Sequence, residues 1–196
     1  MYQTNKNKDK RAILLGMALG DGYITNSKYY KALVIRHSEK QKEYLLFKKQ
    51  LLEKIFFGRT ISTRNVQSGI QIAIGNNRLF SIYRKWLYPN GVKYIPNILK
   101  YLDLQSIAIW YMDDGSLTAK KRNGKIHGYE LTLNTYVSKE ENQLIINWFR
   151  ENYSILFTQT KGKNKYRLRM GTKEAKKFIT LIQPYIHETM LYKINL

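Results

Sequence analysis

The chain has 196 residues, of which 43% are hydrophobic, enough to bury the core of one large domain or two small ones. Its 34 basic and 14 acidic side chains give a formal charge of +20, which excludes an enzyme with a neutral surface and favours a polyanionic partner. The absence of cysteine excludes disulfides and thiolate metal sites and favours an intracellular setting. Neither a signal peptide nor a membrane span is expected, because the apolar run at 13–20 is too short to cross a bilayer.

The first half of the chain predicts a flexible basic arm at 1–10, then helix, two strands, helix, two strands and helix. Hydrophobic spacing and turn residues place these elements at helix 11–20, hairpin 23–37, helix 40–56, strands 60–65 and 69–74, and helix 77–87. A turn sequence, Tyr88-Pro89-Asn90-Gly91, follows them.

The second half predicts the same order of elements. They are placed at helix 104–113, a hairpin with its turn at 120–124 and return strand 129–134, helix 139–153, strands 154–160 and 165–170, and helix 172–182. The repeat predicts an α+β fold with two αββαββα halves, residues 1–97 and 98–196.

The first helix of each half ends in an apolar run followed by aspartate and glycine. The runs are Leu14–Gly22 and Ile107–Gly115, and their aspartates, Asp21 and Asp114, are 93 residues apart. Glycine after such a run is typical of the C′ position of a helix, so each aspartate is expected where the helix dipole is already negative. A carboxylate there is unfavourable unless a cation neutralises it. Two such helix ends side by side predict a cation-binding site.

The two motif helices are expected to pack against each other about a pseudo-twofold axis. Ala12, Gly16 and Gly20 recur every four residues and form one small-residue face, on which another backbone can approach closely. The second run has Ile109 and Asp113 where Gly16 and Gly20 would align. We therefore predict an asymmetric contact between the helices.

Carboxylate, carbonyl and phosphate oxygens are the ligands that Mg²⁺ prefers. Two helix-end carboxylates joined by the scissile phosphates of DNA would form a centre for metal-assisted hydrolysis, with a lysine able to act as base or to stabilise charge. We predict Asp21 and Asp114 as the metal ligands, with Gly20 and Asp113 as further candidates. Asp113 is expected to flank the site, because its register differs by one residue from that of Asp114. The expected cofactor is Mg²⁺, as two or three divalent ions, and Mn²⁺ is expected to be able to substitute for it.

The predicted strands interleave basic and hydrogen-bonding side chains with apolar ones. Strand alternation places one set against the helices and leaves the other free to read base edges in the major groove of DNA. A solvated sheet face is the alternative, and no acidic residue occurs within the candidate set. The candidate DNA-binding residues are Arg36, Arg59, Arg64, Gln67, Gln71, Gln159, Lys161, Lys163, Lys165, Arg167 and Arg169.

The doubled motif resembles that of the LAGLIDADG homing endonucleases, in particular the single-chain members with two repeats. Lys93–Asn97 is similar to the lysine-bearing segment before the second motif of that family, and Met190–Lys193 to its terminal counterpart. Leu131–Thr135 resembles the strand that follows the second motif. The resemblance covers nearly the whole chain.

This resemblance implies saddle-shaped antiparallel sheets that grip a long double-stranded DNA site, in a monomer with internal pseudo-twofold symmetry. It also implies Mg²⁺-dependent double-strand cleavage with short 3′ overhangs. The active-site residues that it implies are Asp21 and Asp114 as metal ligands, Lys93 and Lys193 near the active-site water, and Asn134 as a polar neighbour. The first-half counterpart of Asn134 is expected on 33–38, where Arg36 or His37 stands in place of an amide.

Two alternatives remain beside the homing endonuclease. One is a maturase that acts on intron RNA, and the other is a DNA-binding regulator without catalysis, against which the presence of both aspartates argues. His37, His127 and His187 are scattered and flanked by polar residues, so none is predicted to bind metal. A mitochondrion or other organelle, or a bacterial or phage cytoplasm, is the expected location.

Overall fold

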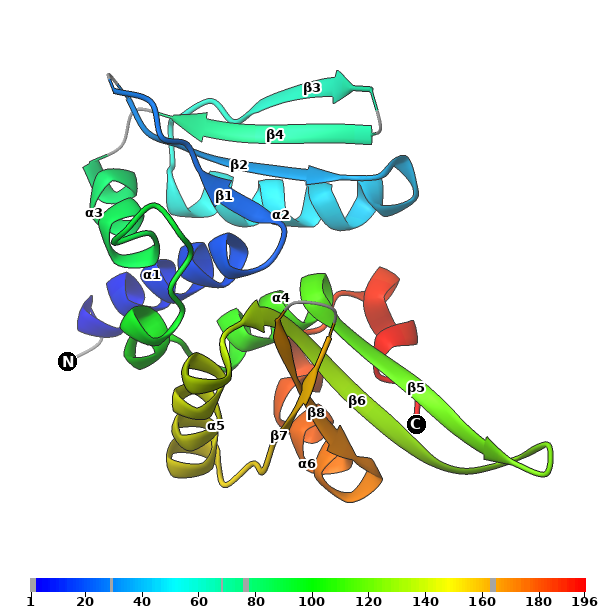
Figure 1. Ribbon diagram of the computed structural model, residues 1–196. Helices are drawn as coiled ribbons and strands as arrows, with labels where there is room; N and C mark the ends of the chain where they lie inside the picture. The colour runs from blue at the N-terminus through cyan, green and yellow to red at the C-terminus, as the bar shows by residue number, and fades with distance from the viewer. Residues whose placement is uncertain (1–2, 29, 68, 76–77, 163–164) are drawn as a thin grey trace.

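The computed structural model describes residues 3–28, 30–67, 69–75, 78–162 and 165–196, and side chains from residue 10 onwards within them. Lys163, which was predicted to bind DNA, lies outside these ranges. The described elements follow the same order twice along the chain (Figure 1).

The first half begins with a long helix and then alternates pairs of strands with helices. Its elements are α1 (Gln3–Leu19), β1 (Gly22–Ile24), β2 (Ala32–His37), the 3-10 turn η1 (Glu39–Gln41), α2 (Lys42–Ile55), β3 (Ser62–Val66), β4 (Gly69–Gly75) and α3 (Arg78–Leu87). A 3-10 segment, η2 (Pro96–Tyr101), connects it to the second half.

The second half repeats the series and adds two 3-10 turns at its end. Its elements are α4 (Leu104–Asp114), β5 (Gly115–Arg122), β6 (Lys125–Val137), α5 (Lys139–Tyr153), β7 (Thr158–Lys161), β8 (Tyr166–Gly171), α6 (Thr172–Ile182), η3 (Gln183–Tyr185) and η4 (Glu188–Lys193). The predicted αββαββα order and the α+β class are therefore confirmed.

Two predicted segments have a different kind of structure. Residues 3–10 are helical rather than a flexible arm, because no glycine or proline interrupts the chain before the buried apolar run and the helix continues into it. The strand predicted from 154 begins only at Thr158. Ser154 takes a left-handed conformation (φ 54°) that ends α5, and the Ile155 N–H donates to Phe149 O, so this segment cannot join the sheet.

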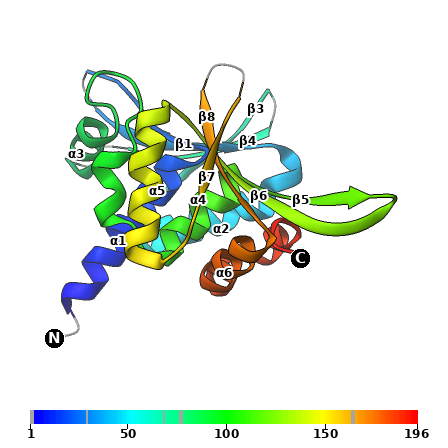
Figure 2. The same cartoon turned by 60° about the horizontal axis from the view of Figure 1, so that its bottom comes forward.

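Each half contains one four-stranded antiparallel sheet, with strand orders β1-β2-β4-β3 and β5-β6-β8-β7. Helices α1 and α4 lie between the two sheets, in the middle of the molecule (Figure 1). Ile70, Ile72 and Ile74 alternate along β4 and are buried in the core, which leaves the intervening residues for the opposite face. The β5–β6 hairpin is longer than predicted and projects beyond its sheet (Figure 2).

The contact between α1 and α4 depends on the small-residue face of α1. A Cβ atom added at Gly16 would lie 2.6 Å from Ser106 O, and one at Gly20 would lie 2.1 Å from Asp113 Oδ2. Ser106 belongs to a capping box at the start of α4, in which the Asp103 side chain accepts a hydrogen bond from the Ser106 N–H. The predicted asymmetry is confirmed, because glycines of α1 face residues with side chains on α4.

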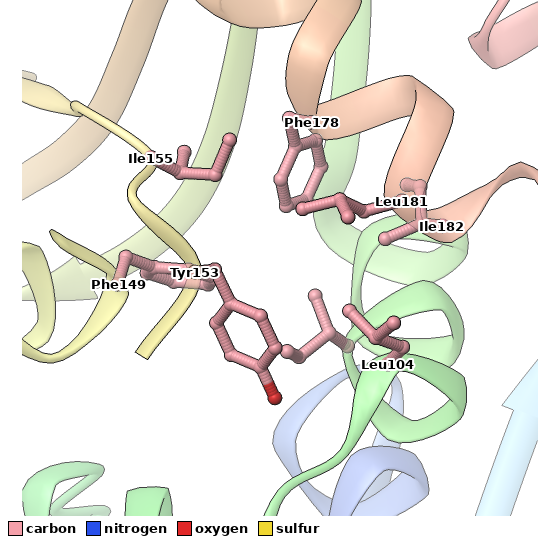
Figure 3. A pocket seen from close by; sticks show the side chains of 8 residues that line it. Leu104, Phe149, Tyr153, Ile155, Phe178, Leu181 and Ile182 are labelled. Atoms are coloured by element: carbon pink, nitrogen blue, oxygen red, sulfur yellow. The ribbon is translucent and has the colours of Figure 1, made fainter. Parts of the chain in front are cut away.

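Helices α4, α5 and α6 enclose an apolar gap in the core of the second half (Figure 3). The side chains that line it are Leu104, Ile107, Phe149, Tyr153, Ile155, Phe178, Leu181 and Ile182. The gap is too narrow for a water molecule, so it is part of the core packing rather than a ligand site. Within the described ranges, every helix is too short or too polar to cross a membrane.

Candidate active site

The C-terminal ends of α1 and α4 lie side by side, as the doubled motif predicted. The Asp21 N–H, just after α1, donates a hydrogen bond to Oδ2 of Asp113 on α4 (3.0 Å). The Asp21 side chain is 40% exposed and the Asp113 side chain is fully buried, whereas Asp114 is partly exposed. Three carboxylates therefore meet at one junction, and one of them opens to solvent.

Gly22 and Gly115 follow the two aspartates, but neither has the positive φ expected at a C′ position. They begin β1 and β5 instead, and Gly115 has φ −85°. Lack of space for a side chain explains why both positions are glycine. A Cβ at Gly22 would lie 2.4 Å from Met17 O, and one at Gly115 would lie 2.4 Å from Tyr111 O.

Both predicted metal ligands have raised pKa values in the metal-free protein. Burial is the main cause for Asp21 and for Asp114, and the negative charge of Asp113 adds to it. The pKa of the Asp114 carboxyl reaches about 7. The junction therefore disfavours the ionised carboxylates until a cation is present, which is the electrostatic character expected of a metal site.

Two lysines cap the motif helices in the same way. Lys93 Nζ donates to Leu19 O (2.9 Å), and Lys193 Nζ donates to Met112 O (2.5 Å) and Asp113 O (3.1 Å). Leu19 and Met112 are equivalent positions, each two residues before its aspartate. Burial lowers the pKa of both lysines, while the nearby aspartates raise it. Each helix end thus has one cation on its free carbonyls, where the helix dipole favours it.

Asn134 lies on β6 beside the second motif, where its Nδ2 donates to Asp114 O (2.9 Å). Its Oδ1 is buried and has no hydrogen-bond partner among the described residues, so it can accept a hydrogen bond from a bound water. Strand register identifies the first-half counterpart. Gly22 pairs with Ile35 as Gly115 pairs with Leu133, and Arg36 therefore occupies the position of Asn134.

Sequence reasoning missed Lys48 and His37. Lys48 on α2 is fully buried, with Nζ 2.6 Å and 2.8 Å from the two carboxylate oxygens of Asp113. Lys48 Nζ also donates to Nε2 of His37 (3.0 Å), whose Nδ1 lies 3.2 Å from Gln41 Oε1 and 3.5 Å from Asp21 Oδ2. Lys48 shares the buried face of α2 with Tyr44 and Leu52. That helical spacing was the signal that could have revealed it.

His37 is neutral near pH 7. Burial, followed by the positive charge of Lys48, lowers its pKa to about 4. Because the Lys48 ammonium can only donate, Nε2 of His37 is the acceptor and Nδ1 holds the proton. This tautomer directs a donor at Gln41 and Asp21.

The carboxylates present two possible sets of metal ligands. Ligand atoms of Asp21, His37 and Asp113 lie within 4.8 Å of one another. In that set, however, Lys48 already pairs with Asp113 and with His37. Asp21 and Asp114 have no such buried cation bound to their carboxylates in the described structure, and Asn134, whose Oδ1 is unpaired, donates a hydrogen bond to Asp114 O. Hard oxygen donors of this kind fit Mg²⁺.

The predicted DNA-binding residues divide between the two faces of each sheet. Arg36, Gln71 and Arg64 form one cross-strand row on the first sheet, on the face opposite the core. In the second sheet, Arg169 and Arg167 share the corresponding face with Thr158 and Thr160, their partners on β7. The other β7 residues, Gln159 and Lys161, point to the opposite face, and Gln159 Nε2 donates to Gln143 on α5 (3.4 Å). The predicted single face is therefore corrected for Gln159 and Lys161.

The remaining candidates lie outside the strands. Arg59 precedes β3 and donates to Gly75 O (2.8 Å), Gln67 lies in the turn between β3 and β4, and Lys165 directly precedes β8. One acidic residue outside the candidate set, Glu130, lies on the same face as Arg169. Its carboxylate pairs with Lys120 (3.1 Å) and with Arg169 (3.4 Å).

We expect Asp114 to contribute a loss of stability to the metal-free protein as pH rises from about 4 to about 7, which the lowered pKa of His37 opposes with a gain between about 4 and 6.5. The folded-state pKa of Asp114 lies above its unfolded value of 3.8, so this carboxyl binds more protons in the folded state, and stability falls as they dissociate. Asp114→Asn should remove this part of the pH dependence and stabilise the protein at pH 8 by on the order of 1–3 kcal/mol. Thermal unfolding in EDTA at several pH values measures both effects. Equal melting temperatures for parent and variant at pH 8 would contradict the expectation.

Comparison with known proteins places this geometry in a family. Residues 11–178 match the LAGLIDADG DNA endonuclease family. The chain is 26% identical to a protein named probable intron-encoded endonuclease 1 from Wickerhamomyces canadensis, over 97% of this chain and 86% of the relative. It is 28% identical to the cytochrome b mRNA maturase bI2 from Debaryomyces hansenii, over 97% of this chain and 76% of the relative.

Among solved structures, the fold matches that of the homing endonuclease I-WcaI bound to its DNA recognition sequence. The TM-score is 0.77 at 25% identity, over 96% of this chain and 87% of the other. The family match covers most of the chain, including both motifs with Asp21 and Asp114. The chain therefore belongs to the LAGLIDADG DNA endonuclease family, as its doubled motif predicted, and is a DNA endonuclease.

Proposed function

We propose that this protein is a site-specific homing endonuclease that makes a metal-dependent double-strand break with short 3′ overhangs in a long DNA target. One observation carries the proposal. The ends of α1 and α4 bring Asp21 and Asp114 to one junction, and each helix end has a lysine on its last free carbonyls. Two pseudo-equivalent sets of carboxylate and cation at one junction suit the hydrolysis of two phosphodiester bonds.

Asp21 and Asp114 would hold two or three divalent ions, with Gly20 O and Asn134 Oδ1 beside them. When bound, Mg²⁺ or Mn²⁺ would supply Lewis acidity and lower the pKa of water. Lys93 and Lys193 add fixed positive charge next to the carboxylates, which favours the negative charge that develops on a scissile phosphate. Asn134 fixes the backbone at Asp114 and offers its free Oδ1 to a water.

The outward faces of the two sheets are the proposed DNA-binding surface. The row Arg36–Gln71–Arg64 places two exposed guanidinium groups on either side of one buried amide, since Arg36 on β2 and Arg64 on β3 both pair with Gln71 on β4. Guanidinium and amide groups are the side chains that hydrogen-bond guanine and adenine edges in the major groove. Arg167 and Arg169 offer the same chemistry on the second sheet.

DNA binding should depend steeply on salt. If the basic surface neutralises six or more phosphates, affinity should fall by about 10³-fold or more between 50 mM and 200 mM salt, because bound counterions are released. Arg64→Ala should reduce the slope of log Kd against log salt, whereas Lys161→Ala, on the opposite face of its sheet, should not. Fluorescence anisotropy with labelled DNA in Ca²⁺ provides the measurement. An affinity that hardly changes with salt would contradict a polyanion-binding role.

The function is tested by joining the DNA that flanks the reading frame, which recreates the uninterrupted site. The purified protein is incubated with this DNA in Mg²⁺, in Ca²⁺ and in EDTA, and both strands are mapped at the cut. We expect cleavage of both strands in Mg²⁺ alone, with staggered 3′ ends. Binding without cleavage would indicate a regulator or a maturase instead. The absence of both binding and cleavage would contradict the proposal.

An intron RNA maturase is the second candidate, and the similarity to a maturase over 97% of this chain favours it. Maturase activity would rest on RNA contacts rather than on the metal site. The variant Asp21→Asn/Asp114→Asn separates the two activities. If the double variant still promotes splicing of the host intron, the maturase role is supported. If the parent protein itself does not promote splicing of that RNA, the maturase role is excluded.

We further propose that residues 1–97 and 98–196 act as the two halves of one monomer, because each supplies one sheet and one motif helix. An organelle, or a bacterial or phage cytoplasm, is the proposed location, in keeping with the intron-encoded relative. Sedimentation of the DNA complex tests the monomer directly, since one chain per target is expected.

A further inference from the structure

Asp113 connects three elements from both halves of the chain. It projects from α4 in the second half, and its two carboxylate oxygens take the Lys48 ammonium of α2 in the first half. Its Oδ2 also accepts the Asp21 N–H directly after α1. Both side chains of the Lys48–Asp113 pair are fully buried. This ion pair therefore holds the backbone at Asp21 from the far side of the interface between the halves.

The same ion pair occupies the second possible set of metal ligands. The ligand atoms of Asp21, His37 and Asp113 lie within 4.8 Å of one another, close enough to surround one cation. Lys48 Nζ lies 2.6–2.8 Å from the Asp113 carboxylate and 3.0 Å from His37 Nε2, so a positive charge already sits against two of the three. A metal ion could enter this set only by displacing a fully buried ammonium from its partners.

Among its described residues, the second half has no equivalent of this arrangement. In the first motif, the residue equivalent to Asp113 is Gly20, which has no carboxylate. A Cβ atom added at Gly20 would lie 2.1 Å from Asp113 Oδ2. Strand register places Thr135 at the position of His37, and its Oγ1 donates to Asn142 on α5 (2.7 Å) in a buried, uncharged pair. The charged network is thus attached to the Asp21 side of the junction alone.

From these contacts we infer that Lys48 is a positioning residue, an internal counter-ion that keeps Asp113 out of metal coordination and fixes Asp21 for its role. Metal is thereby reserved for Asp21 and Asp114. Because the network reaches Asp21 and has no counterpart at Asp114, the two strand cuts depend on Lys48 unequally. The prediction that the two strand cuts depend unequally on Lys48 rests on the proposed nuclease function, whereas the prediction about metal binding does not.

The metal consequence is tested on the free protein, with Mn²⁺ alone as the probe. Electron paramagnetic resonance counts bound Mn²⁺ in the parent protein, in Lys48→Met and in Lys48→Met/Asp113→Asn. Lys48→Met exposes the Asp113 carboxylate to a cation, so it should bind Mn²⁺ at least about tenfold more tightly than the parent. The double variant should return to the parental affinity. Lys49→Met is the matched control, because Lys49 is the next residue on α2 and pairs with Glu53 at the surface.

If Lys48→Met does not fold in EDTA, added Mn²⁺ should restore its thermal unfolding transition, because the metal replaces the missing charge. A folded Lys48→Met without a gain in Mn²⁺ affinity, or an unfolded one that Mn²⁺ does not restore, overturns the inference. So does a gain that persists in the double variant, because Asp113 would then not be the ligand released.

The unequal dependence of the two strand cuts is tested with a duplex labelled on both strands, in which the cleavage rate of each strand is measured under single-turnover conditions. In Lys48→Met/Asp113→Asn, one strand should slow at least about tenfold more than the other, and nicked duplex should accumulate. Equal slowing of both strands would mean that the pair only supports the fold, which overturns the positioning role. A parent protein that cuts no DNA would contradict the proposed function, and the Mn²⁺ measurement would still decide the role of Lys48.

Discussion

Asp21→Asn and Asp114→Asn should each lower the rate of DNA cleavage by about 10³-fold or more, with DNA affinity within about threefold of the parent. The two carboxylates lie at paired helix ends whose only proposed task is to hold metal beside the scissile phosphates. DNA affinity comes instead from arginines and lysines on the sheet faces, which these changes leave intact. Removing a negative charge also favours contact with DNA, so the loss should appear in the cleavage step and not in binding.

Single-turnover cleavage in Mg²⁺ and DNA binding in Ca²⁺ measure the two quantities separately. Glu39→Gln is the matched control, because Glu39 is a surface carboxylate that pairs only loosely with Lys42 (3.8 Å) and should change neither quantity. Cleavage retained by the double variant Asp21→Asn/Asp114→Asn would contradict the assignment of the site.

Gly16→Ala should destabilise the protein by about 3 kcal/mol and lower its melting temperature by about 6–12 °C. The new Cβ atom would lie 2.6 Å from Ser106 O and 2.8 Å from Ser106 Cα, so backbone rather than a flexible side chain must move. The displaced helix is α4, whose other end holds Asp113 and Asp114. Cleavage activity should therefore fall more than stability alone explains when both are measured below the melting temperature.

Thermal unfolding of Gly16→Ala is compared with that of Gly171→Ala. Gly171 has φ −85° and no atom within 4 Å of an added Cβ, so alanine there should change the melting temperature little. A Gly16→Ala variant as stable as Gly171→Ala would mean that α1 and α4 do not pack as closely as described.

The order of elements and the paired helix ends could be predicted because local patterns determine them. Apolar spacing marks α2 and α5, turn residues separate the strands, and the two Asp-Gly motifs mark the ends of α1 and α4. The 93-residue repeat then indicated that these ends meet. Strand boundaries were less accurate where a single backbone conformation decides them, as at Ser154, which ends α5 in a left-handed turn.

The Lys48–Asp113–His37 network could not be predicted, because it depends on which face of α2 meets the end of α4. Lys48 is followed by a second lysine, and in the sequence the pair resembles a solvated stretch of helix. Likewise, Gln159 and Lys161 belong to a run of basic and polar residues, and only the pairing of β7 with β8 shows which face each occupies. Tertiary pairing supplies this information, and local sequence does not.

The assignment of Asp21 and Asp114 as the metal ligands is tested most directly by a crystal structure of the DNA complex with Mn²⁺, in which the metal is located by anomalous scattering. We expect Mn²⁺ at about 2.0–2.3 Å from carboxylate oxygens of Asp21 and Asp114, with Lys48 still paired to Asp113. Mn²⁺ bound instead among Asp21, His37 and Asp113, with Lys48 displaced, would contradict this assignment.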